Sequence, residues 1–314
     1  MLIASIIAIA VFSVSIISLG DVFVAATDGN GRDQQTEVSR IFNKTNSINS
    51  NKSDNNSDVL KVQILANSLE KRIKDAIALM EITGKSSEIR SMPNASLLNA
   101  TLNGFNGIPE HADMTRRTVA QNIISNYNDI SAIGFIMPNG VVYFLEPYSR
   151  QENLTTDNLA FRDYYKGVLN TNKTYLEIVD SASSDHRQTN IAVPVFSNDN
   201  TLIGLWVGGI DLSVFDQELQ SIKLPEGQRI VYVDSNGGEI AGSDNKLVTN
   251  ISESFANLTS FQRAIGGGSG SVIEEVDQEK MLISYYPVEA LNDRWAILWM
   301  RPVNDSSNII KSPR

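Results

Sequence analysis

Five side chains between residues 162 and 211 are of types that could together bind a small charged molecule. A guanidinium group presents paired donors that match a carboxylate, a phenol can donate a hydrogen bond, and an aromatic ring can wall a cavity or face an ammonium group. Two aspartates could pair with that ammonium group, whose burial without an opposite charge would cost several kcal/mol. The candidate ligand-binding residues are Arg162 for the guanidinium, Tyr164 for the phenol, Tyr165 for the aromatic ring, and Asp180 and Asp211 for the two carboxylates.

Each of these residues also has a purely structural interpretation. Arg162 can form a surface charge pair with Asp163, and the two tyrosines can be core or rim aromatics. Asp211 precedes Leu-Ser-Val and can cap the next helix, whereas Asp180 precedes Ser-Ala-Ser-Ser and can lie in a turn. The five residues taken together therefore carry more weight than any one of them.

The candidate residues lie on or beside segments with clear strand and helix signals. Two apolar runs, at 191–196 and 202–211, are joined by Ser-Asn-Asp-Asn, which predicts a hairpin. Residues 175–179 form a shorter strand-forming run. Residues 158–169 carry aromatic and apolar residues at a spacing that suits a short helix.

Two further strands and a helix precede this region. Strands at 130–138 and 141–147 flank Pro-Asn-Gly, a strong turn signal. Asp113 or Thr115 can cap a helix that runs through Asn126. With the three later strands, these segments predict a five-stranded antiparallel sheet.

A long helix is predicted before this sheet and a second sheet after it. Apolar residues recur mostly at helical spacing over residues 59–82, and Gly84 ends the pattern. A short helix at 214–222 and a break at Pro225 and Gly227 separate the two sheets. The second sheet is predicted from strands at 229–234, 239–241, 271–276, 281–288 and 295–301, with a helix at 255–265.

The order of these parts resembles the membrane-distal half of double-Cache (dCache) sensor domains, the extracytoplasmic part of many chemoreceptors and sensor histidine kinases. The resemblance is carried by Arg-Asp-Tyr-Tyr at 162–165 before three strands and by Gly-Gly-Ile-Asp-Leu at 208–212, which closes the last of them. It spans residues 59–302. It implies an α+β fold in which a long N-terminal helix is followed by two PAS-like (Cache) units, each an antiparallel sheet with flanking helices.

The resemblance also implies an amino-acid-binding pattern, in which an arginine and an aromatic pair are followed by two aspartates that hold the α-amino group. Arg162, Tyr165, Asp180 and Asp211 fall on matching positions. The sequence departs from this pattern at three positions: Tyr164 stands where a tryptophan is usual, and Asp157 and Ile178 stand where tyrosines are expected. We therefore expect a small polar organic ligand, which can be an amino acid, an amine or a carboxylate.

The chain is expected to have six parts. These are a signal anchor or signal peptide (1–26), a disordered polar tether (27–58), a long bracing helix (59–84), a membrane-distal, ligand-binding Cache unit (85–222), a membrane-proximal Cache unit (223–303) and a polar tail (304–314). The apolar run at 2–19 is long enough to span a bilayer, which predicts a membrane-anchored protein with an extracytoplasmic domain. Small residues at Val24 and Ala26 allow the alternative, cleavage near Ala26 and secretion.

Composition argues against several functional classes. The net charge of −10 without a basic patch argues against nucleic-acid binding. The 314 residues contain no cysteine, and the two histidines, His111 and His186, lie near no nucleophile motif. We expect no enzyme activity, no cofactor and no metal, since solvation in a loop explains His111 better than metal binding does. Asp-His-Arg at 185–187 is expected to form a lid over the ligand.

The expected role is small-molecule sensing for signal transduction or chemotaxis. No output domain follows residue 303 in this sequence, so we expect occupancy to pass to a signalling partner protein or through a homodimer. If the sequence is a fragment of a longer receptor, the signal would pass to the rest of that receptor. The alternative is a structural or adhesive surface glycoprotein without a ligand. This alternative is favoured by ten Asn-x-Ser/Thr sequons, more than composition alone predicts.

Overall fold

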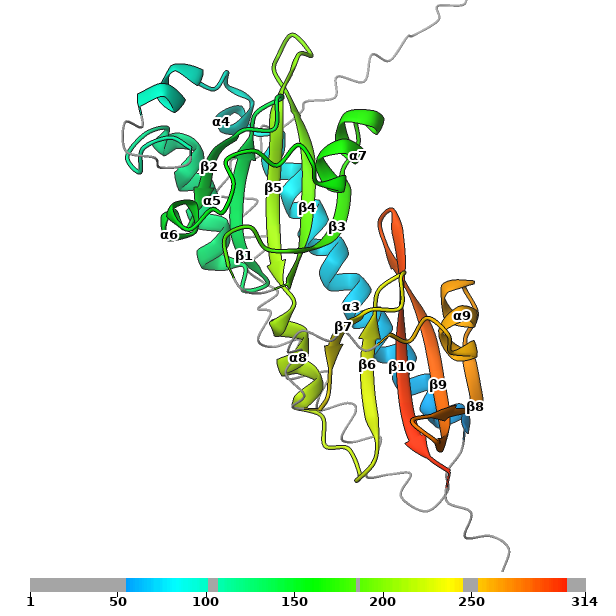
Figure 1. Ribbon diagram of the computed structural model, residues 1–314. Helices are drawn as coiled ribbons and strands as arrows, with labels where there is room; N and C mark the ends of the chain where they lie inside the picture. The colour runs from blue at the N-terminus through cyan, green and yellow to red at the C-terminus, as the bar shows by residue number, and fades with distance from the viewer. Residues whose placement is uncertain (1–54, 101–106, 185–186, 245–253, 304–314) are drawn as a thin grey trace, which may run out of the picture.

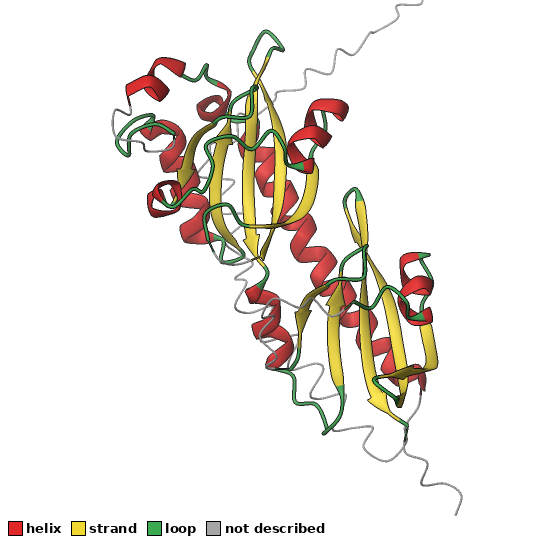
Figure 2. Cartoon of the chain, viewed as in Figure 1, coloured by secondary structure: helices red, strands yellow, loops and turns green. Residues whose placement is uncertain are grey.

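The computed structural model describes residues 55–100, 107–184, 187–244 and 254–303, in which two antiparallel sheets are arranged along one long helix (Figures 1 and 2). This helix, α3 (Asn55–Gly84), has 30 residues and is about 45 Å long at 1.5 Å per residue. It runs behind both sheets in Figure 1. Its buried apolar side chains recur at helical spacing and include Val62, Leu65, Leu69, Ile73 and Met80. The helix predicted from residue 59 thus begins four residues earlier and ends where Gly84 predicts.

The first sheet has five strands in the order β2-β1-β5-β4-β3, and every neighbouring pair is antiparallel. This confirms the five-stranded antiparallel sheet expected from the sequence. The hairpin predicted around Ser-Asn-Asp-Asn joins the two longest strands. The strands are β1 (Ile130–Ile136), β2 (Val142–Glu146), β3 (Tyr175–Asp180), β4 (Arg187–Phe196) and β5 (Leu202–Asp211).

Helices cover both faces of this distal sheet. On one face, α3 and α5 (Met114–Asn126) pack against a single apolar cluster that contains inward-facing residues such as Phe135 and Trp206. The other face carries α7 (Asp163–Thr171), with α6 (Tyr148–Glu152) beside β2. Two short helical segments, α4 (Ser87–Arg90) and η1 (Ala95–Ala100), follow α3.

Local side-chain contacts decide where two of these helices begin. Asp113 is the N-cap of α5 and accepts a hydrogen bond from Arg116 N, which confirms one of the two predicted caps. Helix α7 begins at Asp163, whereas the sequence predicted a start at residue 158. The Asn158 side chain accepts a hydrogen bond from Ala160 N at 2.9 Å, and this closes a turn where the helix was expected.

The second sheet repeats the arrangement of the first. Its strand order is β7-β6-β10-β9-β8, again antiparallel throughout. Helix α9 (Thr259–Ile265) covers one face and α3 the other, and α8 (Ser213–Gln220) connects the two units. The strands are β6 (Arg229–Val233), β7 (Glu239–Gly242), β8 (Gly270–Val276), β9 (Glu279–Ala290) and β10 (Asp293–Pro302). The expected α+β fold with two such units is confirmed.

Polar contacts join the two units beside α3. The Asn292 side chain, at the tip of the β9–β10 hairpin, accepts from Leu176 N at 2.8 Å and donates to Leu176 O at 3.1 Å. Buried Arg72 of α3 donates two hydrogen bonds to Asp129 and also pairs with Glu218 of α8. The bracing helix is therefore tied by charge to the distal unit and to α8, which leads into the second unit, in addition to its apolar packing.

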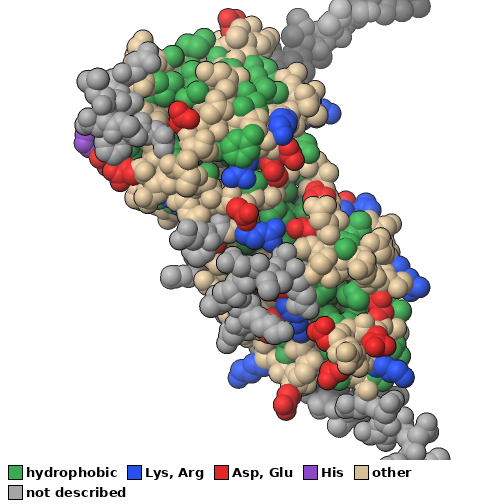
Figure 3. Space-filling model, in the orientation of Figure 1, with side chains coloured by type: hydrophobic (Ala, Val, Ile, Leu, Met, Phe, Trp, Pro, Cys, Tyr) green, Lys and Arg blue, Asp and Glu red, His purple; other side chains and the backbone are tan. Residues whose placement is uncertain are grey.

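The surface seen in Figure 3 mixes acidic and basic side chains along the length of the molecule. Within the described residues, no helix combines the length and apolar character needed to cross a membrane. The anchor or signal segment predicted at 1–26, residues 27–54 of the tether predicted at 27–58 and the tail predicted at 304–314 lie outside the described residues. The last four residues predicted for the tether, 55–58, are instead the first turn of α3.

Candidate functional site

A cavity of about 50 Å³ lies against the distal sheet, on the face that carries α7. Its floor is formed by β1, β2, β4 and β5, and its roof by residues between Leu154 and Ser183. One part of the lining is apolar and includes Ile136, Phe144, Leu154 and Val207. The polar part of the lining consists of Arg162, Tyr164, Ser183, Gln188 and Asn190.

The alternation of side chains along strands explains this floor. Gln188 and Asn190 are two residues apart on β4, so both point to the same face of the sheet. They pack against Gly209 of β5, where an added Cβ would lie 3.2 Å from both Asn190 Oδ1 and Gln188 Nε2. A glycine at this position therefore leaves room for the two amides beside the cavity.

Arg162 lies at the rim of the cavity, immediately before α7. It is partly exposed, and its Nη2 donates to the backbone oxygen of Asp180 at 2.8 Å. Its guanidinium also lies over the Phe161 ring, 4.9 Å from the centroid. Among the described residues, no carboxylate oxygen lies within ion-pair distance of it. Arg162 thus keeps donors available beside the cavity.

Tyr164 is 1% exposed, and its ring lines the cavity. Its backbone N–H donates to Glu177 at 2.7 Å, which fixes the first turn of α7. Burial raises the pKa of the Tyr164 phenol well above its ordinary value, so the hydroxyl remains protonated. Within the part of the chain that the structure describes, this hydroxyl has no hydrogen-bond partner, and it can therefore donate to a ligand.

The structure does not bring the other three predicted residues to the described lining. The Tyr165 hydroxyl donates to Pro138 O at 2.8 Å, and burial raises the pKa of its phenol. The Asp180 side chain is 90% exposed and lies 3.9 Å from Arg187 Nε. Asp211 Oδ1 accepts from Ser213 N at 2.9 Å, in the turn that starts α8. Binding roles for these three residues stay predictions.

Three polar residues of the lining, Ser183, Gln188 and Asn190, were not predicted from the sequence. Uncharged amides and hydroxyls on a strand and its adjoining loop carry no motif. Gln188 and Asn190 belong to a polar stretch, residues 187–190, that precedes the apolar run predicted as a strand at 191–196, and β4 includes this stretch. Arg150 of α6 contacts one of these residues and donates a hydrogen bond to Gln188 Oε1 at 3.3 Å. Burial lowers the pKa of Arg150, while the nearby Asp211 charge acts in the opposite direction.

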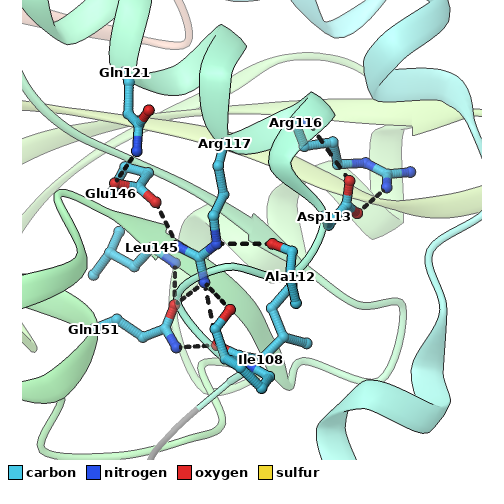
Figure 4. Close-up of polar contacts among 10 residues, drawn as sticks. Ile108, Ala112, Asp113, Arg116, Arg117, Gln121, Leu145, Glu146 and Gln151 are labelled. Atoms are coloured by element: carbon cyan, nitrogen blue, oxygen red, sulfur yellow. Dashed lines mark hydrogen bonds and ion pairs between the residues drawn. The ribbon is translucent and has the colours of Figure 1, made fainter.

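A buried arginine holds the apolar side of the cavity in place (Figure 4). Arg117 of α5 pairs with Glu146 at the end of β2 and donates to Gln151 Oε1 at 2.9 Å. Gln151 Oε1 also accepts from the backbone N–H of Leu145 at 3.1 Å, and Leu145 lines the cavity. The Arg117 guanidinium further lies over the Phe144 ring, at 5.1 Å from its centroid. These contacts fix the wall formed by β2 before any ligand binds.

Acidic and histidine side chains do not gather into a metal-binding group of three or more anywhere in the described residues. His111 is exposed in the loop before α5. The lid predicted at 185–187 lies mostly outside the described residues. Arg187 is described, and it donates to Glu239 O at 2.8 Å, in the second unit.

The family of the chain follows from its sequence match. A family profile described as the Cache domain matches residues 44–308. The chain belongs to the double-Cache family. Cache domains of this family bind ligands and sense signals, as the resemblance in the sequence implied. No curated protein matches the chain.

Solved Cache domains of chemoreceptors share this fold. One is the ligand-binding domain of the Pseudomonas aeruginosa PAO1 amino acid chemoreceptor PctB in complex with L-Gln, with 15% identity, a TM-score of 0.53 and coverage of 76% of this chain and 87% of that one. The periplasmic sensory domain of the Campylobacter jejuni chemoreceptor Tlp1 has 15% identity and a TM-score of 0.55, covering 81% and 96%. PctC of P. aeruginosa PAO1 in complex with GABA has 15% identity and a TM-score of 0.53, covering 76% and 95%. At these identities the likeness shows the fold alone.

Proposed function

We propose that this protein is an extracytoplasmic small-molecule sensor whose distal Cache unit, residues 85–222, binds a small polar organic ligand in the cavity beside α7. The observation that carries the proposal is a preformed cavity into which the Tyr164 hydroxyl and the Arg162 guanidinium bring donors not used by described residues. Buried donors without acceptors cost free energy, which a ligand with acceptor oxygens would recover.

The comparisons support the general role. PctB and PctC are amino acid chemoreceptors with L-Gln and GABA bound to their ligand-binding domains. Both ligands are small organic molecules with a carboxylate. The same fold in this chain places a cavity in the distal unit, so sensing for chemotaxis or another signalling route is the function that the site supports best.

We further propose that occupancy passes through the proximal Cache unit, residues 223–303, to a signalling partner protein or a second copy of the chain. The contacts of Asn292 with β3 and of Arg187 with Glu239 O support this route, because they join the second unit to strands that flank the cavity. An anchor at residues 2–19 would hold the molecule at the outer side of a membrane.

A thermal-shift screen of the full chain against amino acids, amines and small carboxylates tests the binding role. A ligand at 100 times its Kd adds about 2.7 kcal/mol to the free energy of unfolding, so a true ligand raises the melting temperature clearly. The shift should be lost in Arg162→Ala and kept in Arg263→Ala, an exposed arginine of α9 far from the cavity.

The absence of a shift with every compound would instead favour the structural or adhesive surface protein. Asp180→Ala and Asp211→Ala belong in the same screen. A ligand whose shift disappears in either variant would assign that aspartate the amine-binding role that the family pattern implies.

A further inference from the structure

A chain of hydrogen bonds that begins at Arg150 fixes the polar wall of the distal cavity. Arg150 Nη1 lies 3.3 Å from Gln188 Oε1, and Gln188 Nε2 lies 2.8 Å from Asn190 Oδ1. A guanidinium group can only donate hydrogen bonds. Gln188 must therefore turn its oxygen to Arg150 and its amide nitrogen to Asn190. Asn190 in turn keeps its own amide nitrogen, Nδ2, as the free end of the chain.

Because Asn190 Nδ2 is free, the polar wall presents hydrogen-bond donors to the cavity. Asn190 lines the cavity and is 6% exposed, and its Nδ2 has no acceptor among the residues that the structure describes. The Tyr164 hydroxyl and the remaining N–H groups of Arg162 are donors beside the same space. The Asn190 and Gln188 oxygens each already accept one hydrogen bond, from Gln188 and Arg150 respectively. The wall is thus complementary to the oxygens of an anion.

No carboxylate is found among the described residues of the lining. The Asp180 side chain is turned to solvent, and Asp211 accepts the Ser213 N–H at the start of α8. A ligand ammonium group in this cavity would meet donors and a guanidinium charge in place of an acceptor. Burying an unpaired ammonium group costs several kcal/mol, so the cavity disfavours it.

The rest of the cavity suits a short hydrocarbon. Its other walls include the apolar residues Ile136, Val142, Leu154 and Val207. A single water needs roughly 10–15 Å³ of such volume. The cavity of about 50 Å³ therefore holds roughly four water-sized groups, which is the size of a carboxylate with a very short chain.

We propose that the distal cavity binds a short, unsubstituted monocarboxylate such as acetate or propionate, with its oxygens held by Arg162, Tyr164 and Asn190, and that it rejects the α-amino acid of the same carbon number. This proposal rests on the proposed sensing function and narrows its ligand class. It differs from the amino-acid pattern of the family because it leaves the two aspartates without a ligand contact.

Isothermal titration of the full chain with propionate, L-alanine and propylamine tests the proposal. Propionate and L-alanine have the same carbons and the same carboxylate and differ by the ammonium group. Propylamine keeps the ammonium group and lacks the carboxylate. We expect propionate to bind at least tenfold more tightly than L-alanine, and propylamine not to bind.

Two variants test the donors. Asn190→Asp replaces the free donor by a carboxylate of the same size and should weaken propionate binding at least tenfold. Asn198→Asp, exposed in the turn between β4 and β5, adds the same charge away from the cavity and should change nothing. Because a buried charge at position 190 can unfold the protein, Arg162→Gln at the partly exposed rim is the second variant, again with at least a tenfold loss. Melting curves without ligand show which variants are folded.

The outcomes separate this proposal from the sensing function. If L-alanine binds more tightly than propionate, the monocarboxylate proposal is wrong, and the sensing function still stands. Propionate binding that a folded Arg162→Gln variant leaves unchanged also overturns it, since the anion would then bind elsewhere. Failure of every carboxylate, amino acid and amine to bind overturns both.

Discussion

Two adjacent tyrosines of α7 are both buried but differ in what their hydroxyls contact. The Tyr165 hydroxyl is satisfied by the backbone oxygen of Pro138, whereas the Tyr164 hydroxyl has no partner in the described part of the chain. A hydrogen bond that is already made contributes to folding. A buried donor without an acceptor costs stability and becomes useful when a ligand arrives. The Tyr165 hydroxyl therefore contributes to folding, whereas the Tyr164 hydroxyl is available for a ligand.

Removing each hydroxyl in turn should separate these roles. Tyr164→Phe should leave the free energy of unfolding unchanged or slightly higher and should weaken ligand binding roughly two- to tenfold, as expected for one hydrogen bond. Tyr165→Phe should lower the free energy of unfolding by about 1 kcal/mol and leave the affinity unchanged. Urea denaturation and isothermal titration measure the two quantities. Equal losses of affinity in both variants would show that Tyr165 also contacts the ligand.

Glu177 of β3, whose carboxylate accepts hydrogen bonds at the start of α7, should make the free energy of unfolding depend on pH. Burial raises the pKa of Glu177, although the N–H groups of Tyr164 and Asp163 donate to it. The folded state thus holds this proton more tightly than the unfolded state does. The resulting stability is present below the unfolded pKa, near the ordinary value of 4.5, and is lost as the pH rises through the folded pKa.

Glu177→Gln removes this titration. Relative to the original protein, the variant should become more stable as the pH is raised from about 4 to about 7. Urea denaturation at both pH values provides the measurement. The matched control is Glu275→Gln, an exposed glutamate on the edge strand β8, which should show no such trend. A difference between Glu177→Gln and the original protein that stays constant with pH would contradict the effect of burial.

At the scale of elements, β3 is the edge strand of the distal sheet, and its open side is contacted at one residue by the second unit. β4 pairs along one side, and at Leu176 the Asn292 side chain takes the place of a peptide group on the other. The β9–β10 hairpin of the second unit thereby covers part of an otherwise open sheet edge. It also attaches the second unit to the strand whose Glu177 positions α7 and Tyr164.

Asn292→Ala should loosen this attachment. Both Leu176 backbone groups would lose a partner, so we expect the free energy of unfolding to fall by about 1 to 3 kcal/mol. Hydrogen exchange should show faster exchange at the Leu176 amide. Asn198→Ala, in an exposed turn, controls for the loss of an asparagine. An unchanged exchange rate at Leu176 would mean that the hairpin does not protect this edge.

Sequence patterns predicted the elements best where one face of each is buried. All ten strands and the long helix were expected, because buried faces leave a clear period in the sequence. β9 extends to Ala290 and β10 starts at Asp293, beyond the predicted ends, because hairpin pairing continues through polar residues that show no alternation. At the site, Arg162 and Tyr164 were predicted, but Gln188 and Asn190 were not. Their place beside Arg162 depends on strand pairing and packing that one sequence does not reveal.

At the scale of the whole molecule, the two units share one apolar core. The cluster around α3 contains Trp206 and Phe135 from the distal sheet and Ile230 and Trp295 from the proximal sheet. Arg72 adds a buried charge cluster at the junction, where losing one partner would leave a charge uncompensated. A helix that is part of both cores cannot unfold in one unit without exposing apolar surface in the other. We therefore expect the two units to unfold together.

The positions of the three tryptophans allow this to be tested with the ligand present. Trp206→Phe leaves Trp295 and Trp299 as the fluorescent residues, both on β10 of the proximal sheet. Circular dichroism reports on both units. If the molecule unfolds as one, the urea midpoints from the two signals coincide, and a ligand in the distal cavity raises both by the same amount. The complementary variant, Trp295→Phe with Trp299→Phe, reports on the distal sheet alone and should give the same ligand shift. A fluorescence midpoint in Trp206→Phe that the ligand does not move would show that the proximal unit folds independently and cannot sense the cavity through its stability.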